Sequence, residues 1–213
     1  MTARTYRQFC GIAKALDVVG ERWSLLIVRD LMEGPRRYVD LRTGLDGIAT
    51  DMLATRLRDL EAAGVVSRHT LPPPAASKVY ELTPLGRSLE PVLVELARWG
   101  LEMLDEDTEG LEFRPHWLGF WLRTMFRPEV ADGVRMTVQF EIDGDPIHAV
   151  IADGTIEVGS GPVTGATLTV VSDPATVARI ARDPAATVDP DRMRITGDRA
   201  DVRTLRRVLG LSR

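Results

Sequence analysis

The chain has 213 residues, of which 44% are hydrophobic and 27% charged, a composition typical of globular proteins. This length is long for one domain and comfortable for two. A single cysteine excludes an internal disulfide framework and any metal site that needs several thiolates, and we expect neither a metal nor a cofactor.

The net charge of -4 is unevenly distributed along the chain. Residues 1–100 carry 14 Lys and Arg against 12 Asp and Glu, whereas residues 101–213 carry 13 against 19. Phosphate binding depends on the local potential rather than on total charge. The mildly basic first half therefore remains compatible with DNA binding.

No apolar run approaches the roughly 20 residues of a membrane span. The first residues, "MTARTYRQFCGIAK", lack the apolar stretch of a signal peptide. We therefore expect a cytoplasmic protein without a membrane partner.

Residues 10–37 predict two helices that are interrupted near Gly20, and Gly34-Pro35 ends the second. A short helix, "YVDLRTGL", follows. The apolar stripe of the first helix is Ile12, Leu16 and Val19, and that of the second is Trp23, Leu26, Ile27 and Leu31.

The next segment, "GIATDMLATRLRDLEAAGVV", predicts an amphipathic helix from about Ala49 to Ala63. Its expected buried stripe is Met52, Leu53, Leu57, Leu60 and Ala63. Its other face carries Thr50, Asp51, Ala54, Thr55, Arg58 and Glu61. Small polar side chains with an arginine suit a helix that enters a groove, but also an ordinary solvent face, so this helix alone leaves both interpretations open.

Two short strands, "VVSRHT" and "KVYELT", follow, joined by "LPPPAAS". Three consecutive prolines have no N–H to donate, so the connection is predicted to be a stiff, extended loop. Thr83 suits a helix N-cap, with Pro84 at the first helical position.

The helix predicted from Pro84 onward has apolar residues at heptad spacing, which is typical of a contact with another helix. These residues are Leu85, Leu89, Val92, Leu96, Trp99 and Met103. They could pack on their own domain, but so small a domain has little core left to cover them. We therefore favour a dimer interface.

The acidic segment 105–112, "DEDTEGLE", is predicted to link residues 1–104 to a second domain, residues 113–213. The second domain begins with "RPHWLGFWLRTMF", which is apolar on nearly all sides. The strand "VRMTVQFEI" then alternates, with Phe140 on its apolar face, and "DGDP" and "DG" mark turns before further short strands. A helix after Asp173-Pro174, the strand "RMRITG" and a last helix from Asp201 to Leu209 complete the pattern. We expect an antiparallel sheet with packed helices, so the whole chain is α+β.

The order helix, helix, short helix, helix and two strands predicts a winged helix-turn-helix for residues 1–104. Residues 10–100 resemble HxlR-type winged-helix transcription regulators. The matching blocks are Trp23 after a Gly-x-Arg turn, "GPRRYVDL", "RLRDLEAAGVV" and "YELTPLGRSL". The resemblance implies a dimeric regulator, here expected to be a repressor, that binds a near-palindromic double-stranded operator.

For the DNA contacts, the major groove admits a helix, and residues near the helix start contact base edges. The candidates for base contact are Thr50, Asp51, Thr55 and Arg58. Asp51 suits an acceptor from cytosine or a helix cap. Phosphate contacts are expected from Arg36, Arg37 and Arg56, and wing contacts from Arg68 and Lys78.

Cys10 precedes the first predicted helix. The HxlR resemblance implies a redox-sensor role for a cysteine near this position, and a helix N-terminus lowers the pKa of a thiol. A lone cysteine is also commonly a small buried hydrophobic residue.

Residues 113–213 resemble, in the order of their elements, a sterol-carrier-protein-like domain. That resemblance implies an apolar small-molecule effector, and the predicted ligand-binding residues are Trp117, Phe120, Trp121, Met125 and Phe140. A domain with a filled core is the alternative.

Catalytic patterns are scarce, because the three histidines are dispersed and "GSGPVTG" lacks the spacing and lysine of a phosphate loop. We therefore expect a binding protein rather than an enzyme. The alternatives to a regulator are an apolar-ligand-binding protein and a protein-interaction module that use the winged helix as a scaffold.

Overall fold

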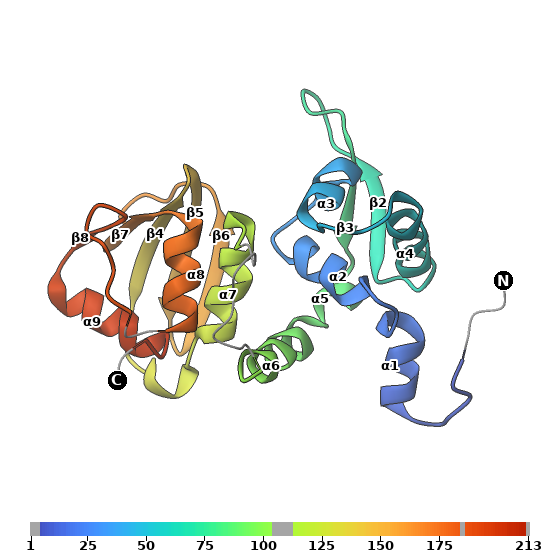
Figure 1. The fold of residues 1–213 in the computed structure, drawn as a ribbon, viewed down its shortest axis with the longest axis horizontal. Coiled ribbons are helices and arrows are strands. Elements are labelled where there is room, and N and C mark those ends of the chain that lie inside the picture. The colour runs from blue at the N-terminus through green and yellow to red at the C-terminus, as the bar shows by residue number, and fades with distance from the viewer. Residues whose placement is uncertain (1–4, 104–112, 184–185, 212–213) are drawn as a thin grey trace. The chain divides into compact units, whose positions relative to one another are not determined.

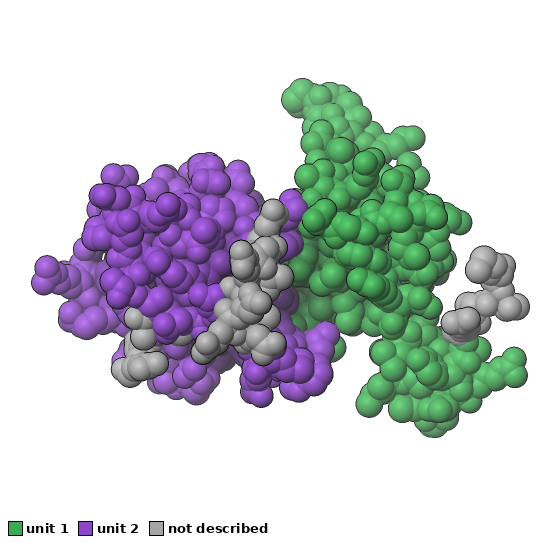
Figure 2. Space-filling model, viewed as in Figure 1, with its two compact units in different colours: residues 1–93 green, residues 94–213 purple. Residues whose placement is uncertain are grey.

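A computed structural model describes residues 5–103, 113–183 and 186–211 of the chain. The described chain forms two compact units, residues 1–93 (unit 1) and 94–213 (unit 2), coloured separately in Figure 2. The predicted acidic linker, residues 105–112, lies outside the described residues. None of the described helices is long and apolar enough to cross a membrane.

Unit 1 combines short helices with a small antiparallel sheet (Figure 1). The helices are α1 (Gly11–Val19), α2 (Ser24–Met32), α3 (Tyr38–Gly44), α4 (Thr50–Ala62) and α5 (Pro84–Arg87). The strands are β1 (Arg36–Arg37), β2 (Val66–Thr70) and β3 (Lys78–Leu82), in the order β1-β3-β2. This arrangement confirms the predicted winged helix-turn-helix, in which β2 and β3 form the wing.

The core of unit 1 is built from α2, α3 and α4. Its fully buried side chains include Ile27, Leu31, Leu41, Leu53, Leu57 and Leu60. All three predicted stripes were partly wrong: Met52 on α4 is 39% exposed, Leu26 on α2 is 40% exposed, and Ile12 and Leu16 on α1 are 73% and 44% exposed. The period of a helix shows which residues share a face, but it does not show whether a neighbouring element covers that face.

Thr83 joins the wing to the following helix, as predicted. Its hydroxyl accepts from the backbone N–H of Gly86 at 3.1 Å and donates to the carbonyl of Gly64 at 2.6 Å. A side chain at Gly86 would clash with the carbonyl of Val65, so only glycine allows this close approach. The turn therefore connects the end of α4 firmly to α5.

The single helix predicted from Pro84 onward was wrong. The structure has two helices, α5 and α6 (Glu90–Leu101), separated at Ser88 and Leu89. Pro91 has no N–H to donate to the carbonyl of Arg87, so a continuous helix would lose that hydrogen bond. Helix α6 begins within unit 1 and ends within unit 2, because the unit boundary follows Leu93.

Unit 2 is a five-stranded sheet with helices on one face (Figure 1). Its strands are β4 (Met136–Ile142), β5 (Asp145–Ala152), β6 (Thr155–Ser160), β7 (Leu168–Ser172) and β8 (Met193–Gly197). Its helices are α7 (Leu118–Met125), α8 (Pro174–Arg182) and α9 (Arg199–Val208), with 3₁₀ turns η1 (Pro115–Trp117) and η2 (Pro128–Val130). The α+β class is therefore confirmed.

The strand order β6-β5-β4-β7-β8 makes this sheet mixed rather than purely antiparallel. Strand β7 pairs with β4 in parallel, with Val138 opposite Leu168 and Phe140 opposite Val170. Residues 161–167 connect the edge strand β6 to β7, which lies on the side of β4 away from β5. Strand β7 therefore runs parallel to β4, whereas an antiparallel direction was predicted. The prediction of an antiparallel sheet was wrong at this one pair.

The crossing segment also explains Gln139, a polar residue of β4 that is only 6% exposed on the face away from the helices. Its side-chain amide donates to the carbonyl of Ile147, and its oxygen accepts from the backbone N–H of Val163 at 2.8 Å. These bonds satisfy the buried amide and hold the crossing segment on the sheet. The opposite face of β4 contributes Val138, Phe140 and Ile142 to the core.

Candidate nucleic-acid interface and ligand cavity

Helix α4 has one buried and one exposed face. Leu53, Leu57 and Leu60 are at most 1% exposed and fix the helix against the core of unit 1. Thr50, Asp51 and Arg58 are exposed, and Thr55 is half-buried. Thr50 and Asp51 are therefore accessible at the start of a firmly packed helix, and Arg58 is accessible in its second half.

Two side chains on this exposed face are connected. Arg58 donates through Nη2 to Thr55 Oγ1 at 3.1 Å and through Nε to the carbonyl of Ala54 at 3.3 Å. Asp51 accepts from the backbone N–H of Met52, so one of its oxygens satisfies the first turn of the helix. Tyr38 on α3 donates to the carbonyl of Thr50 at 2.7 Å and joins the two helices.

The predicted phosphate-contact arginines do not form one group. Arg36 is half-buried, with Nε donating to the carbonyl of Asp30 at 2.7 Å. The Arg56 side chain is only 15% exposed and lies 3.1 Å from Asp59 and 3.8 Å from Glu21. Arg56 is therefore turned toward acidic neighbours of its own unit.

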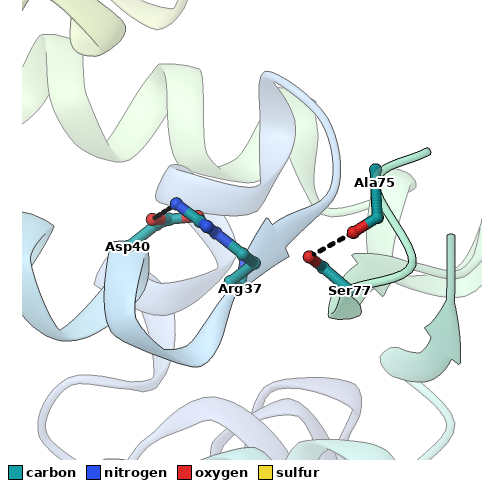
Figure 3. Close-up of polar contacts among 4 residues, drawn as sticks. All are labelled: Arg37, Asp40, Ala75 and Ser77. Atoms are coloured by element: carbon teal, nitrogen blue, oxygen red, sulfur yellow. Dashed lines mark hydrogen bonds and ion pairs between the residues drawn. The ribbon is translucent and has the colours of Figure 1, made fainter. Parts of the chain in front are cut away.

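Arg37 is the most accessible of the three, with a side chain that is 56% exposed. It pairs with Asp40 at 2.8 Å at the start of α3 (Figure 3). The hydrogen bond from Arg37 and its positive charge lower the pKa of the Asp40 carboxyl below its usual value, and the same contact raises the pKa of Arg37. Arg37 therefore stays a cation on the surface of unit 1.

The wing carries the remaining predicted DNA contacts. Arg68 on β2 lies with its guanidinium 5.6 Å from the centre of the Tyr80 ring on β3, a cation–π contact. Lys78 is exposed at the start of β3. At the tip of the wing, Ser77 Oγ donates to the carbonyl of Ala75 at 2.8 Å and tightens the loop (Figure 3).

Several large apolar side chains on α5, α6 and the residues after α6 are exposed. Leu85, Val92 and Trp99 are 59%, 57% and 60% exposed, and Leu89 is half-buried. Leu96 and Met103 are 41% and 56% exposed. The residues predicted to form a dimer interface are thus largely uncovered within this chain.

The segment around α1 is also apolar and exposed. Phe9, Ile12 and Leu16 are all exposed, and Cys10, the N-cap residue of α1, is exposed beside them. The interpretation of Cys10 as a buried hydrophobic residue was therefore wrong, and its sensor role stays a prediction.

Unit 2 contains an apolar cavity of about 120 Å³ between the helix-covered face of its sheet and the helices. Its walls include Leu118 and Trp121 from α7, Phe140 and Ile142 from β4, Val177 from α8, and Leu205 and Arg206 from α9. Two of the predicted ligand-binding residues, Trp121 and Phe140, line it, whereas Trp117, Phe120 and Met125 do not. The residues from α8 and α9 were not predicted, because their register against the sheet is set by tertiary packing.

Metal binding has no candidate in the described part of the chain, where no group of three or more His, Cys, Asp and Glu residues lies close enough to hold an ion.

Comparison with known proteins matches the first half of the chain. A family model described as HxlR-like helix-turn-helix matches residues 18–108. The transcriptional regulator YvaP of Bacillus subtilis is 36% identical over 92 residues, which are 43% of this chain and 85% of that protein. YkvN, a transcriptional regulator of the same organism, is 40% identical over 91 residues, 43% of this chain and 77% of that protein.

Among solved structures, the reduced form of the transcriptional regulator YodB from B. subtilis is 32% identical. The match covers 46% of this chain and 97% of that chain, with a TM-score of 0.41. The curated relatives are named as transcriptional regulators, in agreement with the prediction of a regulator rather than an enzyme. The family model ends at residue 108, so the sterol-carrier-like identity of residues 113–213 stays a prediction.

Proposed function

The chain belongs to the HxlR-like helix-turn-helix family of DNA-binding transcriptional regulators, and on that premise we propose that it is a homodimeric repressor. The observation that carries the proposal is α4, which exposes Thr50 and Arg58, with the half-buried Thr55 between them, opposite a fully buried leucine face. In this proposal α4 enters the major groove, and the wing, residues 66–82, lies on the adjacent backbone or minor groove. The protein acts in the cytoplasm, on chromosomal DNA.

Arg58 is the main base-reading residue in this proposal. Its guanidinium can donate two parallel hydrogen bonds to guanine, the commonest specific contact in the major groove. The hydrogen bond to Thr55 restricts its rotamers before DNA arrives, which reduces the entropy lost on binding. Thr50 and Thr55 suit contacts with a thymine methyl group or a phosphate, and the free acceptor capacity of Asp51 suits a cytosine amino group.

Phosphate contacts come from Arg37, Arg68 and Lys78, which position the protein without reading sequence. Arg36 contributes mainly through its positive charge, because its Nε is engaged with the backbone of Asp30. Arg56 is assigned a structural role here, since Asp59 and Glu21 already partner it.

Dimerisation is proposed through the exposed apolar residues of α5 and α6. Exposed apolar patches of this kind mark interaction surfaces. A second copy related by a two-fold axis would cover them and would place two α4 helices in successive major grooves. The operator is then near-palindromic, with half-sites about one DNA turn apart.

Fluorescence anisotropy with labelled DNA from upstream of the protein's own gene tests the assignment of α4. We expect Arg58→Ala to weaken specific binding about tenfold or more, the usual effect of losing one bidentate base contact. Arg194→Ala, which removes the same charge from an exposed position on β8, is the control and leaves binding unchanged. If Arg58→Ala and the native protein bind the labelled DNA with equal affinity, Arg58 does not contact the bases.

Repression is tested separately with a reporter gene under the same upstream DNA. We expect deletion of the regulator to raise expression and Arg58→Ala to reproduce that rise. A fall in expression on deletion would identify an activator instead.

Unit 2 is proposed to bind an apolar small-molecule effector in its cavity. The space of about 120 Å³ exceeds the roughly 15 Å³ that one water needs, and its walls are almost entirely apolar. An effector alters DNA binding only if it binds one arrangement of the two α4 helices better than the other. Mass spectrometry of the protein purified from its host tests for a bound apolar molecule. If the purified protein carries no such molecule and binds no apolar probe, the alternative of a domain with a filled core is favoured.

A further inference from the structure

The basic residues of unit 2 are concentrated near its C-terminal end. Residues 113–191 carry 6 arginines against 11 Asp and Glu, whereas residues 192–211 carry 6 arginines against 2 Asp and Glu. An otherwise acidic unit therefore has one strongly basic part, which contains β8 and α9. Because the attraction of a polyanion depends on the local potential, the net charge of the whole unit does not exclude such a partner.

Helix α9 has a basic face opposite a buried apolar face. Leu205 and Val208 are buried in the core of unit 2. Arg199, Arg203 and Arg207 follow one another at intervals of four residues, and all three are exposed. With 3.6 residues in each turn, this spacing places the three side chains along the side of the helix away from the core. These three residues are called the arginine stripe below.

No acidic residue neutralises the arginine stripe. Its side chains make no hydrogen bond or ion pair with any residue that the structure describes. Asp198 is the N-cap of α9 and accepts from the backbone N–H of Ala200 at 2.6 Å. Asp201 lies two residues from both Arg199 and Arg203, which places it on the far side of the helix. The positive charges of the stripe are therefore available to a partner.

The arginine stripe does not stabilise the helix that carries it. Like charges four residues apart on a helix repel each other, and the stripe contains two such pairs. Arg199 is also the first residue of α9, where the positive end of the helix dipole disfavours a cation. A polyanion that binds along the stripe relieves both unfavourable interactions.

We infer that the arginine stripe is a second DNA-contacting surface, which binds the phosphate backbone without reading sequence. The chain belongs to a family of DNA-binding regulators, so duplex DNA is a polyanion that it meets. The stripe extends about 12 Å along the helix, over which one DNA strand presents about three phosphates. An anionic membrane is a poorer match, because the apolar residues of α9 that would enter a bilayer are buried in the core. The surface goes beyond the proposed role of α4, since it adds affinity for any sequence.

Fluorescence anisotropy with a labelled duplex of random sequence tests this contact in the full-length protein. The stripe variant carries Arg199→Gln, Arg203→Gln and Arg207→Gln together. Arg206 is kept, because its guanidinium donates to the carbonyl of Leu211. We expect the affinity for the random duplex at low salt to fall about tenfold or more. The slope of log affinity against log salt concentration should become shallower by about 3 for each bound chain, because each lost phosphate contact removes about 0.9.

A matched control removes the same charge from other exposed positions of unit 2, through Arg135→Gln, Arg192→Gln and Arg194→Gln together. Arg135 and Arg192 already pair with acidic residues. Arg194 lies on the face of the sheet away from α9, because its neighbours Met193 and Ile195 line the cavity on the other face. We expect this control to bind the random duplex as the native protein does, and circular dichroism checks that both variants are folded.

The stripe variant and Arg58→Ala give different results if both proposals are correct. The stripe variant should weaken binding to the random duplex and to the upstream DNA equally, whereas Arg58→Ala should weaken binding to the upstream DNA more. If the stripe variant binds the random duplex as the native protein does, the inference is overturned and the proposed role of α4 remains. If the native protein binds neither duplex at low salt, both are wrong.

Two further results would also overturn the inference. Equal losses in the stripe variant and its control would mean that the total charge of unit 2 matters rather than the stripe. Sedimentation with vesicles of phosphatidylserine and phosphatidylcholine tests the membrane alternative. If the stripe variant loses vesicle binding but keeps its affinity for DNA, the stripe is a membrane contact.

Discussion

Arg58 and Thr55 are joined by a hydrogen bond of 3.1 Å on the exposed face of α4, with Arg58 as the donor. The contact holds the guanidinium over the first half of the helix, where recognition helices contact base edges. In the proposed complex, Thr55 therefore acts partly by positioning Arg58.

Replacing Thr55 with valine tests this relationship. Thr55→Val preserves the branched shape but removes the acceptor, so Arg58 loses its restraint before binding. We expect operator affinity to fall about fivefold, the effect of one hydrogen bond, measured by fluorescence anisotropy. Thr43→Val, at an exposed position on α3, is the control. Unchanged affinity for the Thr55 variant would mean that neither the hydroxyl nor its bond to Arg58 matters for DNA.

The pair of Arg37 and Asp40 predicts a dependence of stability on pH. Arg37 lowers the pKa of Asp40 in the folded protein, so the stabilisation is present above the pKa of an unfolded aspartate. It is lost as the pH falls through the lower pKa of the folded state. We expect the Tm of Asp40→Asn to lie below that of the native protein at neutral pH, and the difference to disappear in acid. A difference that persists at the lowest pH would show that the substitution acts through something other than the lost carboxylate charge.

The burial of two apolar residues on α4 predicts how much each contributes to the free energy of unfolding. Leu57 is 1% exposed, so we expect Leu57→Ala to lower the free energy of unfolding by about 3 kcal/mol. Met52 is 39% exposed, so Met52→Ala should lower the free energy of unfolding by well under half of the loss expected for Leu57→Ala. Urea denaturation followed by circular dichroism measures both. Similar losses for the two variants would contradict the orientation of α4.

The exposed apolar residues of α6 predict the effect of a charge at the dimer interface. Trp99 is 60% exposed within one chain, and in the proposed dimer it is covered by the partner. Trp99→Glu should convert the dimer to a monomer, because a buried unpaired carboxylate is strongly unfavourable. Light scattering after size-exclusion chromatography measures the mass. Val39→Glu, at an exposed apolar position on α3, is the control, and an unaltered dimer in the Trp99 variant would place the interface elsewhere.

Features set by local sequence were predicted well. The 3.6-residue period of Leu53, Leu57 and Leu60 located α4, and the pair Thr83-Pro84 located the start of α5. Both signals act within one turn of a helix, so no knowledge of distant residues is needed. Pro91 was a local signal that was overlooked, and it explains the interruption between α5 and α6.

Features set by distant residues were not predicted. The parallel pairing of β4 with β7 depends on where residues 161–167 cross the sheet, and nothing within either strand reveals it. Arg56 has the same side chain as Arg58 two positions away, yet Glu21 and Asp59 partner it. Around the cavity, the aromatic composition of α7 predicted Trp121 as a lining residue. Arg206 could be assigned to the cavity wall only from the position of α9 against the sheet.

The central claim is that two copies of this chain bind one operator through α4. Light scattering of the purified protein, alone and with duplex DNA from upstream of its gene, tests it most directly. The account predicts a dimer that binds as two chains per site, with affinity that falls steeply as salt is raised. A monomer that does not bind double-stranded DNA, even at low ionic strength, would contradict it.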